Sequence, residues 1–173
     1  KVSPLLNNLI EKNENNKYFV DLYEIKLKQN ISSNENKLNL ISVISSFFGP
    51  MNRIFCFERY LLNTILSSKD SKILPKKLSE LNIGDKYLAW TVTNTSEQEV
   101  LFKWNMLSTS GYTLLGYRST STDTIIYHGN LLIQGNNMKN NGIFSNMLNS
   151  FHGFYAKLLI AESASVLDSE SVI

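Results

Sequence analysis

The sequence predicts a single α+β domain, in which a long apolar C-terminal helix packs against a curved antiparallel sheet. Three observations support this prediction. The chain has 173 residues, close to the commonest size of one domain. Four consecutive segments of its second half have the composition of strands and are joined by loops of hairpin length. After them, residues 143–167 repeat apolar side chains at helical spacing.

The composition excludes several classes of protein. Lysine and arginine number 17 against 15 acidic residues, and this excess is too small for a surface that neutralises nucleic-acid phosphates. No apolar run reaches the roughly 18 residues of a membrane span, and the first residues do not resemble a signal peptide. The single cysteine, Cys56, stands among apolar residues, so we expect a buried structural thiol. We therefore expect a cytoplasmic protein that has no integral membrane segment and binds no nucleic acid.

The first half of the chain predicts one strand and a bent pair of short helices. Residues 1–17 are expected to form an N-terminal arm, and the alternation of apolar and polar residues over 18–28 predicts a strand. Apolar residues at helical spacing predict a helix that ends at 48, where a Gly-Pro step follows. Residues 51–66 predict a second helix of similar character.

The second half of the chain predicts an antiparallel meander followed by the long helix. The four expected strands are residues 87–93, 99–105, 112–119 and 124–134. The apolar stripe of the last helix is expected to consist of Phe144, Met147, Leu148, Phe151, Tyr155, Leu158, Leu159 and Glu162. The domain is expected to span residues 18–167, and residues 168–173 are expected to fray.

The order of these elements is that of the helix-grip, or START-like, architecture of the SRPBCC type. Short motifs also carry a family resemblance, namely DLYEIKL at 21–27, residues 48–62 with Arg59, IGDKY at 83–87, EVLF at 99–102, TIIYH at 124–128 and Phe151-His152. Through these motifs the chain is similar, over residues 18–167, to an uncharacterised bacterial family, domain of unknown function 2867. The sequence departs from the family pattern at Lys103-Trp104-Asn105, which replaces an acidic turn.

Glu58 is the most informative carboxylate, because it stands among the apolar residues of the second predicted helix. A carboxylate that faces a core must be paired, or its pKa must rise. Arg59, Arg118 or a histidine is the expected partner, in either a structural ion pair or an acid at the mouth of a cavity. Arg118 is also a candidate for binding an anionic head group of a ligand.

The two histidines of the chain are the other titratable candidates. His128 shares a strand face with Ile126 and Asn130, so on a concave face it would point into a cavity. On the opposite face it would be an ordinary hydrogen-bonded histidine exposed to solvent. His152 lies at the border of the apolar stripe of the last helix, where a capping or packing role is the alternative to ligand binding.

Aromatic residues are numerous for so small a sheet. They are Trp90, Trp104, Tyr112, Tyr117, Tyr127, Phe151 and Tyr155, and most of them are expected to be ordinary core. A sheet that curls around a helix leaves a volume that aromatic walls and a few polar groups convert into a ligand pocket. The predicted ligand-binding residues are therefore Glu58, Trp90, Trp104, Tyr117, Arg118, His128, Phe151, His152 and Tyr155.

Three functional hypotheses follow from these residues. The first is a non-catalytic domain that binds a hydrophobic small molecule or lipid between the sheet and the last helix. The second is an enzyme of the cyclase or dehydratase kind, which START-like scaffolds host, with Glu58 or His128 as general acid or base. The third is an interaction module that forms a homodimer through exposed aromatic residues. Phosphate-loop, nucleophile-elbow and zinc motifs are missing, so no cofactor or metal is expected.

Overall fold

The computed structural model describes residues 3–12, 18–28, 39–65, 81–87, 90–106, 109–120, 122–133 and 142–170. Within the C-terminal helix, the side chains from His152 to Ser169 are described. The expected loop over 29–37 and most of the expected connection over 67–85 lie outside the described residues.

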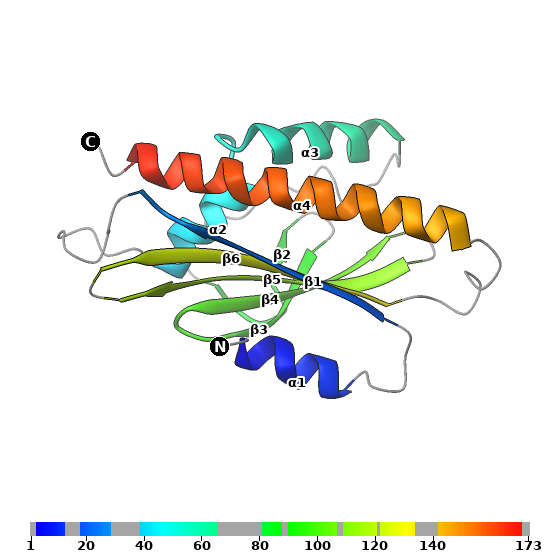
Figure 1. The fold of residues 1–173 in the computed structure, drawn as a ribbon, viewed down its shortest axis with the longest axis horizontal. Coiled ribbons are helices and arrows are strands. Elements are labelled where there is room, and N and C mark those ends of the chain that lie inside the picture. The colour runs from blue at the N-terminus through cyan, green and yellow to red at the C-terminus, as the bar shows by residue number, and fades with distance from the viewer. Residues whose placement is uncertain are drawn as a thin grey trace.

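Six antiparallel strands form one open, twisted sheet in the order β1-β6-β5-β4-β3-β2 (Figure 1). Strands β3 to β6 are a meander as predicted, and β1 pairs with β6 at the edge of the sheet. The predicted strand over 87–93 is divided into β2 and β3. The strands are β1 (Tyr18–Lys26), β2 (Lys86–Tyr87), β3 (Trp90–Thr95), β4 (Glu99–Met106), β5 (Thr109–Ser119) and β6 (Thr124–Ile133).

Helices cover both faces of this sheet. The bent pair α2 (Leu40–Phe48) and α3 (Arg53–Ile65) lies on the same side as the long helix α4 (Gly142–Glu170), whereas α1 (Pro4–Lys12) lies on the other side (Figure 1). We call the two sides of the sheet the α4 face and the α1 face. The predicted α+β helix-grip arrangement, with a bent helix pair and a C-terminal helix packed on an antiparallel sheet, is thus confirmed.

Helix α1 replaces the N-terminal arm that the sequence predicted. Pro4 begins the helix, and the Ser3 hydroxyl caps it by accepting a hydrogen bond from the Leu6 amide at 3.2 Å. Leu6 and Leu9 are buried against Leu114 and other apolar side chains of the α1 face. The short apolar stretch is helical because the α1 face of the sheet is itself apolar and must be covered.

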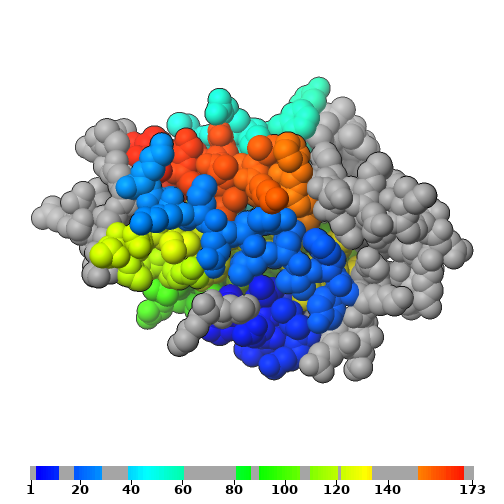
Figure 2. All heavy atoms as spheres, in the orientation of Figure 1, coloured from blue at the N-terminus to red at the C-terminus, as the bar shows by residue number. Residues whose placement is uncertain are grey.

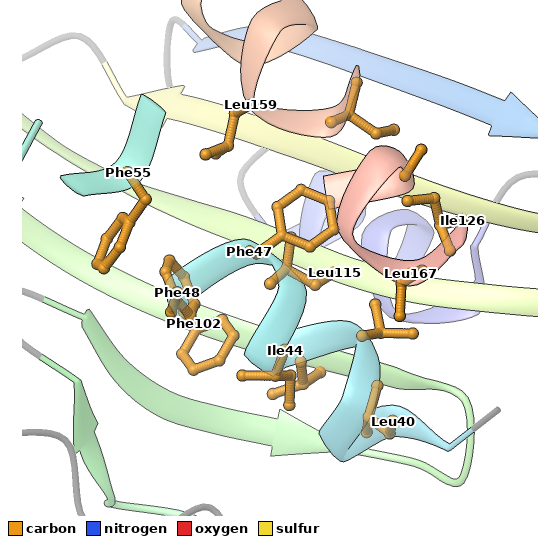
Figure 3. Packing of buried hydrophobic residues seen from close by; sticks show 14 of the residues in the cluster. Leu40, Ile44, Phe47, Phe48, Phe55, Phe102, Leu115, Ile126, Leu159 and Leu167 are labelled. Carbon is orange, nitrogen blue, oxygen red and sulfur yellow. The ribbon is translucent and has the colours of Figure 1, made fainter. Parts of the chain in front are cut away.

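The main core lies between the α4 face and the helices α2 and α4 (Figure 3). Phe48 stands at its centre, with ring centroids 5.1 Å from Phe55, 5.4 Å from Trp90 and 5.4 Å from Phe102. These separations are those of favourable tilted and edge-to-face aromatic pairs. Helix α2 therefore fills much of the space between the sheet and α4 with side chains.

Asn52 connects the three helices of this layer. Its side chain is fully buried, and its amide donates hydrogen bonds to the Ser46 carbonyl at 2.9 Å and to the Ser163 hydroxyl at 3.0 Å. Its Oδ1 accepts a hydrogen bond from the Phe55 amide at 3.0 Å, which caps the start of α3. A single side chain thus joins the end of α2, the start of α3 and the middle of α4.

In the part of α4 whose side chains are described, the buried face differs from the predicted stripe. Four members of that stripe lie outside the described side chains, namely Phe144, Met147, Leu148 and Phe151. The side chains that α4 buries are Ala156, Leu159, Ile160, Ser163, Ala164, Val166 and Leu167. Leu158 is 39% exposed and Glu162 pairs with Arg53 of α3, so neither faces the sheet. The predicted stripe lies on a different side of the helix from the buried face. Small residues occupy much of the buried face, and their low hydrophobicity gave the sequence pattern little weight there.

The described residues differ from two smaller expectations. Residues 168–170 continue α4, and the Asp168 carboxylate accepts a hydrogen bond from the Lys28 amide at 3.1 Å, so this end of the helix is anchored to the end of β1. Cys56 is exposed on α3, and Phe57 beside it is 61% exposed. Helix α3 buries Phe55 instead, because the side that faces the core is turned away from these two residues.

Within the described residues, no single helix has the length and apolar character needed to cross a membrane. The segments Leu40–Phe48 and Arg53–Tyr60 satisfy those criteria only when taken together, across a bend of 53°.

Replacement of Asn52 tests the junction of the three helices. We expect Asn52→Ala to lower the free energy of unfolding by about 2–4 kcal/mol, because a helix cap is lost and buried partners are left unpaired. Asn39→Ala is the matched control, since Asn39 caps α2 at an exposed position through the Ser42 amide at 2.8 Å. Urea denaturation measures both, and equal losses in the two variants would contradict the role of Asn52.

Candidate functional site

A band of polar side chains crosses the α4 face of the sheet. Thr113, Asn130 and Asp21 are register partners on the neighbouring strands β5, β6 and β1. The Thr113 hydroxyl donates to Asn130 Oδ1 at 3.1 Å, and Asn130 Nδ2 donates to Asp21 Oδ1 at 2.9 Å. The band therefore runs in one direction and fixes the Asn130 amide. The Tyr23 hydroxyl also interacts with the Asp21 carboxylate, and burial and this carboxylate together raise the pKa of Tyr23.

His128 lies in the next row of the same face. It stands opposite Tyr23 of β1, is 2% exposed, and has its ring centroid 5.5 Å from that of Phe47 in α2. The interpretation of His128 as a solvent-facing strand histidine is therefore wrong. It points into the layer between the sheet and the helices.

Helix α4 brings His152 to the same place. A Cβ atom on the neighbouring Gly153 would lie 2.9 Å from the Tyr23 hydroxyl, so the helix approaches the sheet closely at this point. Burial lowers the pKa of His152, and the Asp21 carboxylate acts in the opposite direction. His152 also contributes to lowering the pKa of His128. His152 thus interacts electrostatically with both strand residues.

Three buried polar atoms lack a hydrogen-bond partner among the described residues, and all three belong to this region. They are Asp21 Oδ2, His128 Nδ1 and His152 Nε2. A buried polar atom without a partner costs about 1–3 kcal/mol, and such atoms are few in native proteins. We call these three residues the polar trio. Strands β1 and β6 and helix α4 each contribute one of them.

The His128 imidazole of the polar trio is neutral at pH 7. Burial, with a smaller contribution from His152, lowers the pKa of His128 to about 3, so its imidazole is neutral. Burial lowers the pKa of His152 as well. A neutral imidazole has one N–H and one accepting nitrogen, whereas the Asp21 carboxylate only accepts. In the part of the chain that the structure describes, no three His, Cys, Asp or Glu side chains are placed to hold a metal ion.

Apolar side chains flank the polar band on its other side. Phe19, Leu132, Gly111 and Trp104 are register partners in the row beyond Asp21. The Trp104 indole lies over Gly111, where a Cβ atom would come within 2.5 Å of the ring. The α4 face therefore presents a polar band between two apolar surfaces.

A second polar contact joins Glu58 of α3 to Tyr155, which lies one helical turn after His152 in α4. Glu58 accepts a hydrogen bond from the Tyr155 hydroxyl, which joins α3 to α4. Burial raises the pKa of Glu58 to about 7, and the bond from Tyr155 acts in the opposite direction. The expected rise in pKa is present, but the partner is a phenol rather than the arginine or histidine that the sequence suggested.

Arg118 does not join the polar trio. It lies on the α1 face, where its guanidinium forms a two-pronged ion pair with Glu24 at 2.8 and 2.7 Å. Tyr127 is on the same face and donates a hydrogen bond to the buried Glu99 at 2.7 Å. Alternation along β5 places Arg118 on the face opposite to Tyr117, away from α4, so the structure does not bring Arg118 together with the other predicted site residues on the α4 face.

The remaining predicted site residues divide into core and border positions. Trp90 is buried between Phe48 and Phe55, whereas Trp104, Tyr117 and Tyr155 are partly buried around the main core. Phe151 lies outside the described side chains.

The sequence prediction missed Asp21, Tyr23, Thr113 and Asn130. The signal for Asp21 was present, because alternation places it on the same strand face as Tyr23 and Ile25. An acidic residue on the inward face of an apolar strand requires a partner.

Comparisons with known proteins give little functional information. No protein-family model and no curated protein matches the chain. Among solved structures, the chain is similar to the Mll3558 protein from Rhizobium loti, with a TM-score of 0.43 and 8% sequence identity over 84% of this chain and 97% of that one. We draw no conclusion from a similarity of this level.

The raised pKa of Glu58 makes stability depend on pH. Because the folded pKa of about 7 exceeds the ordinary value of 4.5 for a glutamate, stability is highest below pH 4.5 and is lost as the pH rises through 7. The loss between pH 5 and pH 8 is expected to be about 2 kcal/mol. Glu58→Gln removes this loss, and Glu11→Gln, at an exposed position on α1, retains it. Thermal unfolding across this pH range measures the difference, and equal slopes in the wild type and Glu58→Gln would contradict the burial of Glu58.

The lowered pKa of His128 has the opposite effect. Its folded pKa of about 3 lies below the ordinary histidine value of 6.5, so its contribution to stability is present above pH 6.5 and is lost as the pH falls. The expected loss between pH 7 and pH 5 is about 2 kcal/mol. His128→Phe is expected to lack this acid-dependent loss, whatever constant offset the new ring causes. Urea denaturation at pH 5 and pH 7 tests this expectation, which fails if the acid-dependent loss is the same in both proteins.

Proposed function

We propose that this chain is a START-like domain that binds a hydrophobic small molecule or lipid between the sheet and α4, with a polar group of the ligand at the polar trio. The observation that carries the proposal is the presence of three buried polar atoms without partners at one place. They come from β1, β6 and α4, so only the assembled fold brings them together. The resemblance to domain of unknown function 2867 and a cytoplasmic location belong to the same proposal and rest on the sequence.

A purely structural role does not account for the polar trio. Replacing a buried polar group by an apolar group of similar shape is often neutral or stabilising, so stability alone does not favour three unpaired atoms. Binding sites do favour them, because a ligand supplies the missing partners. The hydrogen-bonded band of Thr113 and Asn130 also holds Asp21 in place before any ligand binds.

The surroundings of the polar trio suit a ligand that is mostly apolar. Phe19, Leu132 and Trp104 extend the α4 face beyond Asp21. Leu132 is already buried, whereas Phe19 and Trp104 are partly exposed. A ligand body that covers Phe19 and Trp104 removes apolar surface from water, which contributes about 25 cal/mol per Å². The polar head and the apolar body of the ligand thus have separate contacts.

A second candidate function is acid–base catalysis, which the environment of Glu58 favours. A carboxyl group with a pKa of about 7 suits proton transfer at neutral pH, and Tyr155 orients it. His128 is the weaker base of the two, because its pKa is about 3. In a cyclase-like or dehydratase-like reaction Glu58 would act on a substrate whose polar group lies at the polar trio.

A homodimer is the third hypothesis, and its contact surface would lie on the outer helices. Phe57 and Tyr60 of α3 and Phe154 of α4 are each more than half exposed. Exposed aromatic residues are enriched where proteins associate.

Native mass spectrometry of freshly purified protein tests the binding proposal. We expect the wild type to carry a small molecule that denaturation releases, and we expect His128→Phe to lose it. Glu24→Gln, on the same strand as Asp21 but on the other face, is expected to keep it. In parallel, an apolar ligand at a hundred times its Kd should stabilise the wild type by about 2.7 kcal/mol. A wild type that carries no ligand and responds to none in a screen of apolar compounds contradicts the proposal.

A further inference from the structure

The open edge of β1 lacks the features that usually protect the edge of a sheet. The two edges are β1 and β2, and β2 is only two residues long. Strand β1 is nine residues long, contains no proline, and pairs with β6 in a continuous register without a bulge. Short edge strands, prolines and bulges are the means by which monomeric proteins prevent a further strand from pairing. Strand β1 has none of these features.

The residues of β1 are also accessible. None of its nine residues is buried, whereas the neighbouring strand β6 is buried over most of its length. Figure 2 shows the side chains of β1 at the surface, between α4 and α1. In the part of the molecule that the structure describes, a further strand can therefore reach this edge.

The backbone hydrogen bonds show which residues of β1 face the open edge. The Leu27 amide, directly after the strand, donates to the Thr124 carbonyl of β6 at 2.9 Å. Because hydrogen-bonded pairs alternate along an antiparallel ladder, the odd-numbered residues of β1 pair with β6. The next even-numbered amide, that of Lys28, donates to Asp168 of α4 instead. The residues whose N–H and C=O groups point to the open edge are Tyr18, Val20, Leu22, Glu24 and Lys26.

We propose that two copies of the chain associate by pairing their β1 strands in antiparallel fashion, which joins the two sheets into one. Main-chain hydrogen bonds between the outward-facing groups supply the contact, as in other cases of strand addition. A twofold axis makes the contact self-complementary and leaves neither β1 edge open. The inference concerns the edge of the sheet and is independent of the ligand-binding proposal.

The charges of β1 select one register. Because outward-facing residues must lie opposite each other, each register is defined by the residue on the twofold axis. Asp21 or Glu24 on the axis would place two carboxylates directly opposite each other, which is unfavourable. Tyr23 on the axis would place the Asp21 carboxylate against the apolar Ile25. Leu22 on the axis pairs all nine residues of both strands, with Asp21 against Tyr23.

The charges of the α1 face do not oppose this register. Glu24 is already paired with Arg118. Lys26 is already paired with Asp123. The contact on the twofold axis is therefore between the apolar side chains of the two Leu22 residues.

The charges of the α4 face favour the same register. Lys157 lies over the Tyr23 ring, with its Nζ 5.6 Å from the ring centre. Since Tyr23 lies opposite Asp21 of the second copy, Lys157 brings a positive charge towards that carboxylate. Phe19 lies opposite Ile25 of the second copy, which adds an apolar cross-strand pair.

Sedimentation velocity tests the association. We expect the wild type to change from the mass of one chain to that of two as its concentration rises. Leu22→Lys and Leu22→Glu each place like charges on the twofold axis, so each variant is expected to remain monomeric. An equal mixture of the two variants is expected to form the dimer again, because opposite charges then meet on the axis. Circular dichroism confirms that both variants are folded.

Amide hydrogen exchange, followed by nuclear magnetic resonance, tests the same pairing in the wild type without any substitution. We expect exchange of the Val20, Leu22 and Glu24 amides to slow at least about tenfold between dilute and concentrated protein. The Asp21 and Tyr23 amides, which pair with β6, are the internal control and are expected to be protected at both concentrations.

Phe57→Lys separates this contact from a dimer that forms through the outer helices. We expect this variant to dimerise like the wild type, because Phe57 belongs to α3 and not to the edge of the sheet. The inference is overturned if the wild type stays monomeric at all concentrations, or if Phe57→Lys abolishes the dimer and Leu22→Lys does not. It is also overturned if the mixture of Leu22 variants stays monomeric, or if exchange of the Leu22 amide does not depend on concentration. Each of these results leaves the ligand-binding proposal unaffected.

Discussion

The close contact between α4 and the sheet is the interaction on which the rest of the structure depends. Small residues such as Gly153, Ala156 and Ala164 line the contact face of α4, so the helix axis can approach the strands. Asn52 fixes this position by hydrogen bonds to α2 and to Ser163 of α4. Figure 2 shows the consequence at the edge of the sheet, where the side chains of β1 lie between α4 and α1. Without α4 in this position the α4 face would be exposed, and neither the main core nor the polar trio would exist.

This contact also determines the chemistry of the polar residues beneath the helix. In water, His128 and His152 would have ordinary pKa values, and Glu58 would be ionised at neutral pH. Burial beneath and beside α4 lowers the pKa of His128 to about 3, lowers the pKa of His152 and raises the pKa of Glu58 to about 7. Three unpaired buried atoms together cost several kcal/mol, which is a large fraction of the 5–15 kcal/mol by which typical domains are stable. Residues that reduce stability in this way are expected at positions where ligand binding, rather than folding, explains which residue types are present.

The sequence predicts much of the fold and about half of the site. The strands and helices of the domain follow from local periodicity, and their order is sufficient to identify the helix-grip arrangement. Helix α1 was missed because its stabilisation comes from the α1 face of the sheet rather than from its own nine residues. His128 and His152 were identified by residue type, and Glu58 by its place among apolar neighbours. The contribution of Asp21, Thr113 and Asn130 depends on strand register, which joins residues as many as 109 positions apart and leaves no local pattern. The partner of Glu58 was missed for the same reason, since Tyr155 reaches it only through the packing of α4 on α3.

A crystal structure of the protein as purified, at a resolution that distinguishes water from a larger molecule, is the most direct test of the central claim. The account predicts a bound molecule beneath α4, with its head group within hydrogen-bonding distance of Asp21 Oδ2, His128 Nδ1 and His152 Nε2 and its body against Phe19, Leu132 and Trp104. The account is contradicted if side chains fill this region completely, or if ordered water molecules alone provide the partners of all three atoms.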